Sequence, residues 1–222
     1  MPIPIFATPV GTFTTSTGAT ALAPPLPVGF AAGDLFFWMT ASKNNAAHTY
    51  PAGWGTLQTN SGAAWTVSVA AKMAVSGEVA AAVSWTGSAA CASQVWRYTG
   101  VDATTPFGVL GTVSTGTGSP HISSSITTTR ANSLVIVVDA AASNTALGAL
   151  TGWTHDLSNG TGGGVGIHFD EQSKGIVAVN TASGAVGPTG SAAAWVEQQL
   201  EILSPVVVVP LRIFPNMPML GM

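Results

Sequence analysis

The sequence predicts an all-β chain folded as an antiparallel β-sandwich, and three observations lead to this class. Charged residues make up only 7 % of the 222 positions, against roughly 25 % in an ordinary soluble protein. The chain breaks into short runs rich in Val, Thr, Ser and Trp, which are bounded by Gly, Pro and Asn. No stretch repeats apolar residues at the three- and four-residue spacing of an amphipathic helix. We expect about eight core strands in a jelly-roll-like arrangement.

The expected strands come four from each half of the chain. They are 34–41, 64–73, 79–85 and 92–99, and then 134–141, 165–171, 176–180 and 194–203. Three N-terminal pieces, 3–6, 10–15 and 20–23, are expected at a sheet edge. In 165–171 the residues Val165, Ile167 and Phe169 alternate with His168 and Asp170. This period of two predicts a strand with one face toward the core and His168 and Asp170 toward solvent.

The two halves resemble each other. GDLFFWMTAS at 33–42 matches NSLVIVVDAA at 132–141, and Gly53-Trp54 matches Gly152-Trp153 at the same offset of 99. TGSAA at 86–90 returns at 189–193. These landmarks follow one order, which predicts an internal duplication. We expect 28–107 and 128–203 to be the similar halves of one sandwich spanning 28–203, because units of this size bury little surface alone. Residues 1–27 are expected to be an N-terminal edge segment, and Trp54 and Trp153 to close the ends of the sandwich.

The last segment, 204–222, is expected to be an extended apolar arm. Four prolines cut it, so it is neither a central strand nor a helix. Apolar surface of this kind marks an interaction site, and an extended segment can bind along a sheet edge or groove of a neighbour. We therefore expect the arm to anchor the subunit to another chain. The residues expected to make the contact are Val206, Val207, Val208, Val209, Leu211, Ile213, Phe214, Met217, Met219 and Leu220.

The candidate chemistry is sparse. Two histidines near carboxylates, at 155–156 and 168–171, could bind a metal, but we interpret His168 and Asp170 as ordinary polar residues of a wet face. No serine lies in a GxSxG elbow. Cys91 is the single cysteine, has no charged neighbour in GSAACAS, and is expected to be a buried structural residue. We expect no catalytic residue, no metal and no cofactor.

Composition also bears on partners. Six basic residues spread over 222 positions cannot form a phosphate-neutralising stripe, so no nucleic-acid partner is expected. No run reaches 18 apolar residues, and the N-terminus lacks the basic region of a signal peptide, so no membrane partner is expected. The seven tryptophans are compatible with an alternative function, a carbohydrate-binding module that contacts a host surface glycan. This alternative would require exposed Trp side chains.

Residues 28–107 carry motifs in a recognisable order. They are AGDLFFWMTAS, PAGWGTLQ, AAKMAVSGE, VSWTGSAA and WRYTGVDATTPF. The series resembles a module common in structural proteins of tailed bacteriophages, which reads AGDLLL, PAGW, a YRVA-like strand, a Ser-Gly turn and a closing YRGVD-x-x-x-P. The closing motif is matched at Tyr98, Gly100, Val101, Asp102 and Pro106, while Thr99 replaces its usual Arg.

This resemblance implies a non-enzymatic β-sandwich component of the virion, assembled in the host cytoplasm. Its implied partners are other copies of itself and other virion proteins. We expect a tail- or baseplate-associated subunit. A capsid decoration protein is the alternative within this class, and a carbohydrate-binding module is the alternative from another class.

Overall fold

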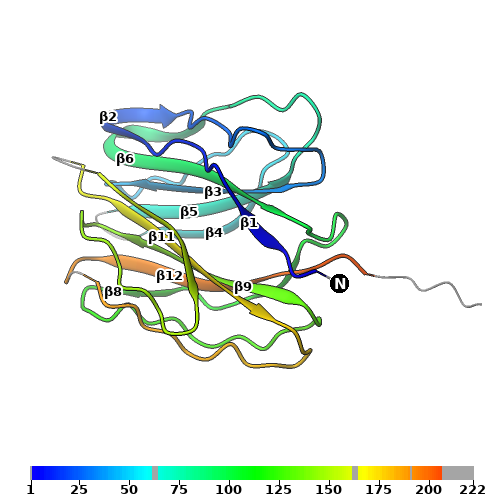
Figure 1. Cartoon of the computed structure of the whole chain (residues 1–222). Helices are drawn as coiled ribbons and strands as arrows, with labels where there is room; N and C mark the ends of the chain where they lie inside the picture. Colours follow the sequence, from blue (N-terminus) through cyan, green and yellow to red (C-terminus); the bar gives the residue numbers. More distant parts are fainter. Residues whose placement is uncertain (1, 62–64, 162–164, 191, 207–222) are drawn as a thin grey trace, which may run out of the picture.

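The computed structural model describes residues 2–61, 65–161, 165–190 and 192–206, and these residues form two antiparallel sheets packed face to face (Figure 1). The predicted β-sandwich is confirmed. Among the described residues, none belongs to a helix with the length and apolar character needed to cross a membrane.

Each sheet is built from one half of the chain. The strands of the first sheet are β1 (Ile5–Ala7), β2 (Thr14–Leu22), β3 (Leu35–Ser42), β4 (Gly55–Ser61), β5 (Thr66–Met73) and β6 (Val83–Thr99). Those of the second are β7 (Phe107–Leu110), β8 (Ser114–Gly116), β9 (Ser133–Ala141), β10 (Thr154–Gly160), β11 (His168–Ile176) and β12 (Trp195–Ile202). The strand orders are β1-β6-β3-β5-β4 and β10-β11-β9-β12-β7; β2 also pairs with β6, and β8 with β12.

The two sheets share one topology. The order β4-β5-β3-β6 of the first sheet recurs as β10-β11-β9-β12 in the second. An irregularity in the pairing also recurs, between Thr56 and Gln58 on β4 and between His155 and Leu157 on β10. The prediction that both halves have the same strand order is confirmed.

The duplication reaches further toward the N-terminus than the sequence landmarks indicated. Contacts of an early segment with β6 recur between an equivalent segment and β12. In the first half, Gly11 N donates to Val95 O (2.9 Å), Gln94 Nε2 donates to Gly11 O (2.8 Å), and Thr14 pairs with Ser93. In the second half, Gly111 N donates to Gln199 O (2.8 Å), Gln198 Nε2 donates to Gly111 O (2.6 Å), and Ser114 pairs with Glu197. Residues 2–27 supply strands β1 and β2 at the edge of the first sheet, as predicted, and they also belong to the first unit. We call the units repeat 1 (2–100) and repeat 2 (101–203).

Three strand predictions differ from the structure. The expected strands 79–85 and 92–99 are one strand, β6, whose Ser/Ala-rich middle and Gly87 (φ 78°) look like a break in the sequence. The expected strands 165–171 and 176–180 are replaced by β11, at 168–176. Four strands were not predicted. Strands β4 and β10 are largely polar edge strands that lack an apolar alternation, and β7 and β8 are only four and three residues long.

The main core lies between the sheets. It combines inward-facing side chains of both repeats, including Phe37, Trp96 and Tyr98 from the first and Ile136, Phe169 and Leu200 from the second. Each repeat therefore covers the apolar face of the other. Each sheet also has an outer face, on the side away from this core, and other segments of the same repeat cover that face.

Loops and aromatic rings cover the outer faces. Trp54 packs on Trp38, with 4.8 Å between ring centroids, on the outer face of the first sheet. Its equivalent Trp153 packs beside Val135 and Ile176 on the outer face of the second sheet. The expectation that these two tryptophans close the sandwich ends was wrong, because both pack against residues of an outer face. Cys91 is buried, as expected.

Candidate functional site

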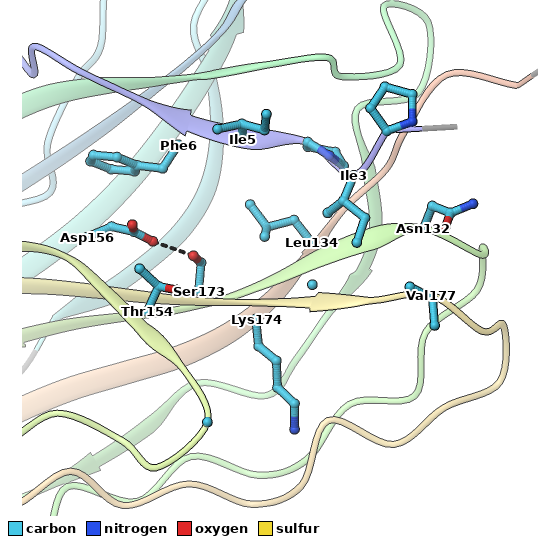
Figure 2. A pocket seen from close by; sticks show the side chains of 14 residues that line it. Ile3, Ile5, Phe6, Asn132, Leu134, Thr154, Asp156, Ser173, Lys174 and Val177 are labelled. Atoms are coloured by element: carbon cyan, nitrogen blue, oxygen red, sulfur yellow. Dashed lines mark hydrogen bonds between the residues drawn. The ribbon is translucent and has the colours of Figure 1, made fainter.

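A cavity of about 790 Å³ lies between the N-terminal residues and one end of the second sheet (Figure 2). Its walls are largely apolar, with Ile3, Ile5 and Leu134 among them. Its two charged side chains already have partners: Asp156 accepts a hydrogen bond from Ser173, which also lines the cavity, and Lys174 lies over the ring of Trp153, 5.7 Å from its centroid. The described lining therefore offers no pair of free titratable groups for acid–base chemistry.

A second feature lies on the outer face of the second sheet, where three carboxylates form a row. Asp139 of β9 is the register partner of both Asp170 of β11 and Glu197 of β12. We call Asp139, Asp170 and Glu197 the acidic row. Their residues are at most 2 % exposed. Burial of three neighbouring acids is costly unless each is paired or hydrogen-bonded.

The prediction that His168 and Asp170 face solvent was wrong. They do point away from the core between the sheets, but they are 4 % and 2 % exposed. The backbone N of Leu147 donates to Asp170 Oδ2 (3.3 Å) and that of Leu150 donates to Gln172 Oε1 (2.7 Å), so the segment after β9 lies over this face.

Asp170 has two histidine neighbours and one backbone donor. His155 Nε2 pairs with its Oδ1, and His168 Nε2 lies 3.2 Å from its Oδ2. The sequence grouped these three residues correctly, and the structure brings them together. Ser158 Oγ lies 3.0 Å from His168 Nε2 and adds a polar contact for that ring. This half of the acidic row thus has two imidazoles for one carboxylate.

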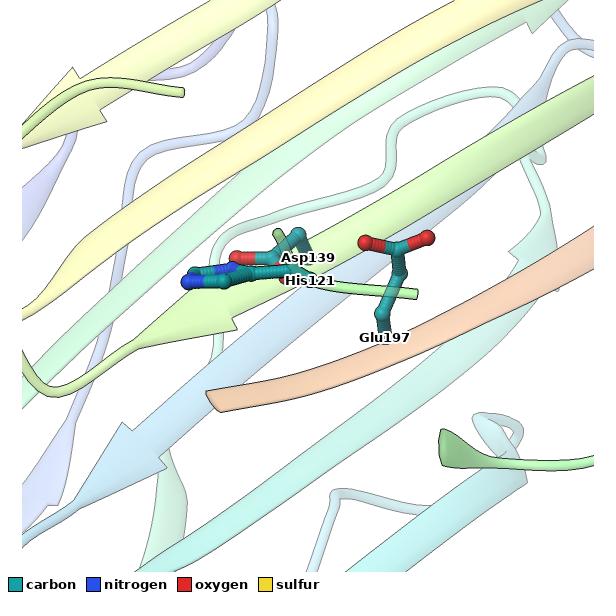
Figure 3. A group of neighbouring side chains, drawn as sticks. All are labelled: His121, Asp139 and Glu197. Carbon is teal, nitrogen blue, oxygen red and sulfur yellow. The ribbon is translucent and has the colours of Figure 1, made fainter. Parts of the chain in front are cut away.

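Asp139 and Glu197 meet a different histidine, His121 (Figure 3). His121 Nδ1 lies 2.9 Å from Asp139 Oδ2, and the ring is 0 % exposed. It stacks on Trp195 with 5.0 Å between centroids and 13° between planes. Trp195 is itself held by a hydrogen bond from its Nε1 to Gly118 O (2.8 Å). The imidazole is therefore packed into one orientation against the carboxylates.

Glu197 is the least compensated member of the row. No hydrogen bond of good geometry reaches either of its carboxyl oxygens, or Oδ1 of Asp139, from the described residues, although Ser123 lies close enough to Glu197 to lower its pKa. Burial, and secondarily the charge of Asp139, raises the pKa of Glu197 to about 9. Burial also raises the pKa of Asp139, to about 6, although the hydrogen bond with His121 opposes this shift. Ligand atoms of His121, Asp139 and Glu197 lie within 4.8 Å of one another, so these residues could hold a metal ion.

The arm predicted to bind a partner begins at a fixed root. Arg130 Nη1 donates to Ser204 O (2.7 Å) and to Asp102 Oδ2 (2.6 Å). Hydrogen bonds from the backbone of Thr105 and Thr104, and then from Arg130, lower the pKa of Asp102 to about 2. Val206 is 62 % exposed. The other predicted contact residues lie outside the described residues: Val207, Val208, Val209, Leu211, Ile213, Phe214, Met217, Met219 and Leu220.

Neither His121 nor Glu197 is among the residues predicted from the sequence. One signal was present, because Asp139 is the single charge in the otherwise apolar strand SLVIVVDAA. A charge in such a strand indicates a buried acid with a partner elsewhere in the chain. The partners themselves depend on strand register and on the path of the loop that carries His121.

Comparisons with known proteins gave no match. A scan of protein-family models, a search of curated proteins and a search of solved structures each returned nothing that matches this chain.

Proposed function

We propose that this chain is a non-enzymatic structural protein of a tailed-bacteriophage virion, a tail- or baseplate-associated subunit that joins the particle through its C-terminal arm. The observation that carries the proposal is the construction of the arm's root. Arg130 holds the carbonyl of Ser204, and Val206, two residues later, is exposed. A segment that is apolar in sequence and is attached to a sandwich at a fixed point is suited to binding along a neighbour's sheet edge.

The phage-like motifs supply the second support. Asp102 belongs to the closing motif WRYTGVDATTPF, and its carboxylate makes the ion pair that orients Arg130. The backbone N of Asp102 also donates to Leu203 O (2.8 Å), the residue just before the arm. The end of the motif, which lies at the start of repeat 2, is thus connected directly to the end of the same repeat. In this proposal the motif positions the arm for assembly.

The burial of the tryptophans weakens the carbohydrate-binding alternative. Sugar-binding sandwiches of that kind stack ligands on exposed rings, and five of the seven tryptophans are at most 7 % exposed: Trp38, Trp65, Trp85, Trp96 and Trp195. Trp54 and Trp153 are half-buried against the outer faces. The feature that favoured this alternative is therefore engaged in packing.

Truncation tests the proposed role of the arm. A chain ending at Ser204 keeps both sheets and the root contact, so it should remain folded and monomeric by circular dichroism and light scattering. It should be missing from purified particles produced by complementation, whereas the full chain should be present by mass spectrometry. A matched control keeps the length of the arm but replaces Val206, Val207, Val208 and Val209 with Ser. Incorporation of either variant at normal occupancy would contradict the proposal.

Electron microscopy locates the subunit. Antibody fragments or gold labels on the full chain should decorate the tail or baseplate of purified particles. Decoration of the capsid surface would support a capsid decoration protein in place of a tail subunit. Absence of the chain from particles, with the chain free in the lysate, would overturn both.

A further inference from the structure

The acidic row has a counterpart in repeat 1 that carries no charge. In the first sheet Thr40 of β3 is the register partner of Ser68 on β5 and of Ser93 on β6. We call these three residues the hydroxyl row. Since the strand order is the same in both repeats, the two rows occupy equivalent places on the two outer faces. The fold can therefore be built with three hydroxyls where repeat 2 has three carboxylates.

The hydroxyl row is fully engaged. Thr40 Oγ1 and Ser93 Oγ lie 2.8 Å apart, and Trp38 Nε1 donates to Ser93 Oγ (2.6 Å). Ser68 Oγ lies 2.6 Å from His48 Nδ1. Each side chain of this row thus has a neutral partner inside the same repeat. Polar groups that are buried and hydrogen-bonded in this way need no ligand.

The acidic row is not balanced in the same way. Asp170 faces two imidazoles, whereas Asp139 and Glu197 share His121. In the described part of the chain the ion pairs of Lys and Arg go elsewhere, to Glu78, Asp34 and Asp102. Three carboxyl oxygens in this half of the row receive no hydrogen bond of good geometry from the described residues, and the contact of Ser123 with Glu197 does not cancel the effect of burial on that carboxyl group. Buried carboxylates are stabilised by paired charges or by a bound metal.

We infer that His121, Asp139 and Glu197 form a buried binding site for one divalent transition-metal ion, of which Zn²⁺ is the best match. An imidazole nitrogen and carboxylate oxygens are established zinc ligands, with bonds of about 2.0–2.2 Å. Calcium and magnesium prefer oxygen-only sets, so the imidazole disfavours them. Oxygens of Asp139 and Glu197 that receive no hydrogen bond of good geometry from the described residues can supply the remaining coordination position.

The site has the character of a structural metal centre. Its ligands are at most 1 % exposed, which leaves little access for a substrate. They come from three separate parts of repeat 2: the segment before β9, β9 itself and β12. A bound ion would fasten the covering segment that carries His121 to two neighbouring strands. This role is compatible with a non-enzymatic subunit, and it does not depend on the proposed function.

The test is a zinc titration of the full chain after removal of metals with EDTA and dialysis. We expect one equivalent of Zn²⁺ by isothermal titration calorimetry and by elemental analysis, together with a higher unfolding temperature. Absence of stoichiometric binding by the wild-type chain would overturn the inference without any variant. Binding of Mg²⁺ or Ca²⁺ with equal affinity would also contradict it.

Variants then assign the ligands. Glu197→Gln and His121→Gln should each weaken Zn²⁺ binding by at least about tenfold, because each removes a ligand from the ion. The matched control is Glu171→Gln. Glu171 is also a fully buried acid, but it lies beside Tyr98 on the opposite face of β11 from Asp170. It should bind Zn²⁺ as the wild type does.

A second control addresses the neighbouring histidine cluster. His155→Gln should leave the stoichiometry unchanged, since His155 pairs with Asp170. Loss of Zn²⁺ binding in His155→Gln with retention in Glu197→Gln would place the ion at Asp170 and overturn the assignment. Circular dichroism of each variant verifies that it is folded. If the Gln variants do not fold, the wild-type titration and the fit of Co²⁺ absorption to an N/O ligand set still decide the question.

Discussion

Thr40 and Asp139 occupy the same place in the two repeats. Thr40 lies on β3 and Asp139 on β9, which are equivalent inner strands of their sheets. Each side chain points to the outer face, and each residue has a register partner on both neighbouring strands. Thr40 is satisfied by the hydroxyl of Ser93 at 2.8 Å, whereas Asp139 contacts the buried imidazole of His121 at 2.9 Å. Equivalent backbone positions in the two repeats thus carry a hydroxyl group in one case and a carboxyl group in the other.

A second pair of equivalent contacts shows how freely the outer face varies. Arg97 and Asp34 form an ion pair of 2.6 Å in repeat 1. At the corresponding positions of repeat 2, Ser133 Oγ donates to Glu201 Oε1 at 2.7 Å. The contact between strands is kept although both partners and the sign of the charge on the last strand differ. The topology therefore determines which positions are in contact, and the residue types at these positions determine whether the contact is an ion pair or a hydrogen bond.

Glycine is required at the equivalent positions 11 and 111. A Cβ at Gly11 would lie 2.3 Å from Pro25 O, and one at Gly111 would lie 2.8 Å from Gln199 O. Gly11→Ala and Gly111→Ala should each lower the free energy of unfolding by about 1–3 kcal/mol, measured by urea denaturation. Gly118→Ala is the control, since nothing lies within 4 Å of a Cβ there. Equal stability of all three variants would refute the close approach.

His48 should make stability fall at mildly acidic pH. It is buried between Ser42 and Ser68, and burial lowers its pKa from 6.5 to about 4. The unfolded chain binds a proton near pH 6.5 and the folded chain only near pH 4, so stability is present above pH 6.5 and is lost as the pH falls toward 4. The loss attributable to His48 is on the order of 3 kcal/mol.

The measurement for His48 is the difference in unfolding free energy between the wild type and His48→Gln from pH 7 to pH 4. Taking the difference removes the contribution of other titrating groups that behave alike in both chains. We expect the stability advantage of the wild type to shrink as the pH falls. A difference that stays constant over this range would contradict the assignment of a buried neutral imidazole.

Glu201 should be a strong stabiliser of repeat 2. Its carboxylate accepts hydrogen bonds from the backbone of Val109, Thr129 and Arg130 and from the hydroxyls of Thr129 and Ser133. Burial alone would raise its pKa, but these hydrogen bonds outweigh burial and lower it. Glu201→Gln should reduce the unfolding free energy by about 2–4 kcal/mol, because hydrogen bonds to a charged acceptor are lost.

A graded control supports this interpretation. Thr129→Val removes a hydroxyl donor to Glu201 and leaves the backbone donors in place. Its cost should be about 1 kcal/mol, clearly below that of Glu201→Gln. Both values come from urea denaturation at pH 7. Equal effects of the two variants would show that the carboxylate is not the centre of this network.

Strand alternation predicted the facing of side chains but not their exposure. Ile167 and Phe169 point into the core and His168 and Asp170 point outward, as the pattern of 165–171 indicated. Whether a loop then covers the outer face depends on contacts such as Leu147 N to Asp170, which join segments far apart in sequence. A period of two carries no information about such a cover.

The sequence contains the N-terminal part of the duplication, but the similarity of this part is too weak to indicate a repeat by itself. VGTFTTSTG at 10–18 resembles LGTVSTGTG at 110–118, yet both are short, polar stretches typical of loops. The structure makes the match clear, because Gly11 and Gly111 form the same backbone hydrogen bond to the last strand of their repeats. The triad of His121, Asp139 and Glu197 could not be predicted without this register.

The central claim is that the carboxylates of Asp139 and Glu197 serve a ligand and not the fold. It is tested most directly by giving these two positions the residues of the hydroxyl row in one variant, Asp139→Thr and Glu197→Ser, with Asp170 and its histidine partners left in place, and measuring its unfolding free energy in EDTA at pH 7. We expect cooperative unfolding, with a stability equal to the wild type or higher by about 1–4 kcal/mol, as found when buried charges are replaced, and no response to Zn²⁺. A variant that is destabilised by several kcal/mol, or that no longer unfolds cooperatively, would contradict the claim.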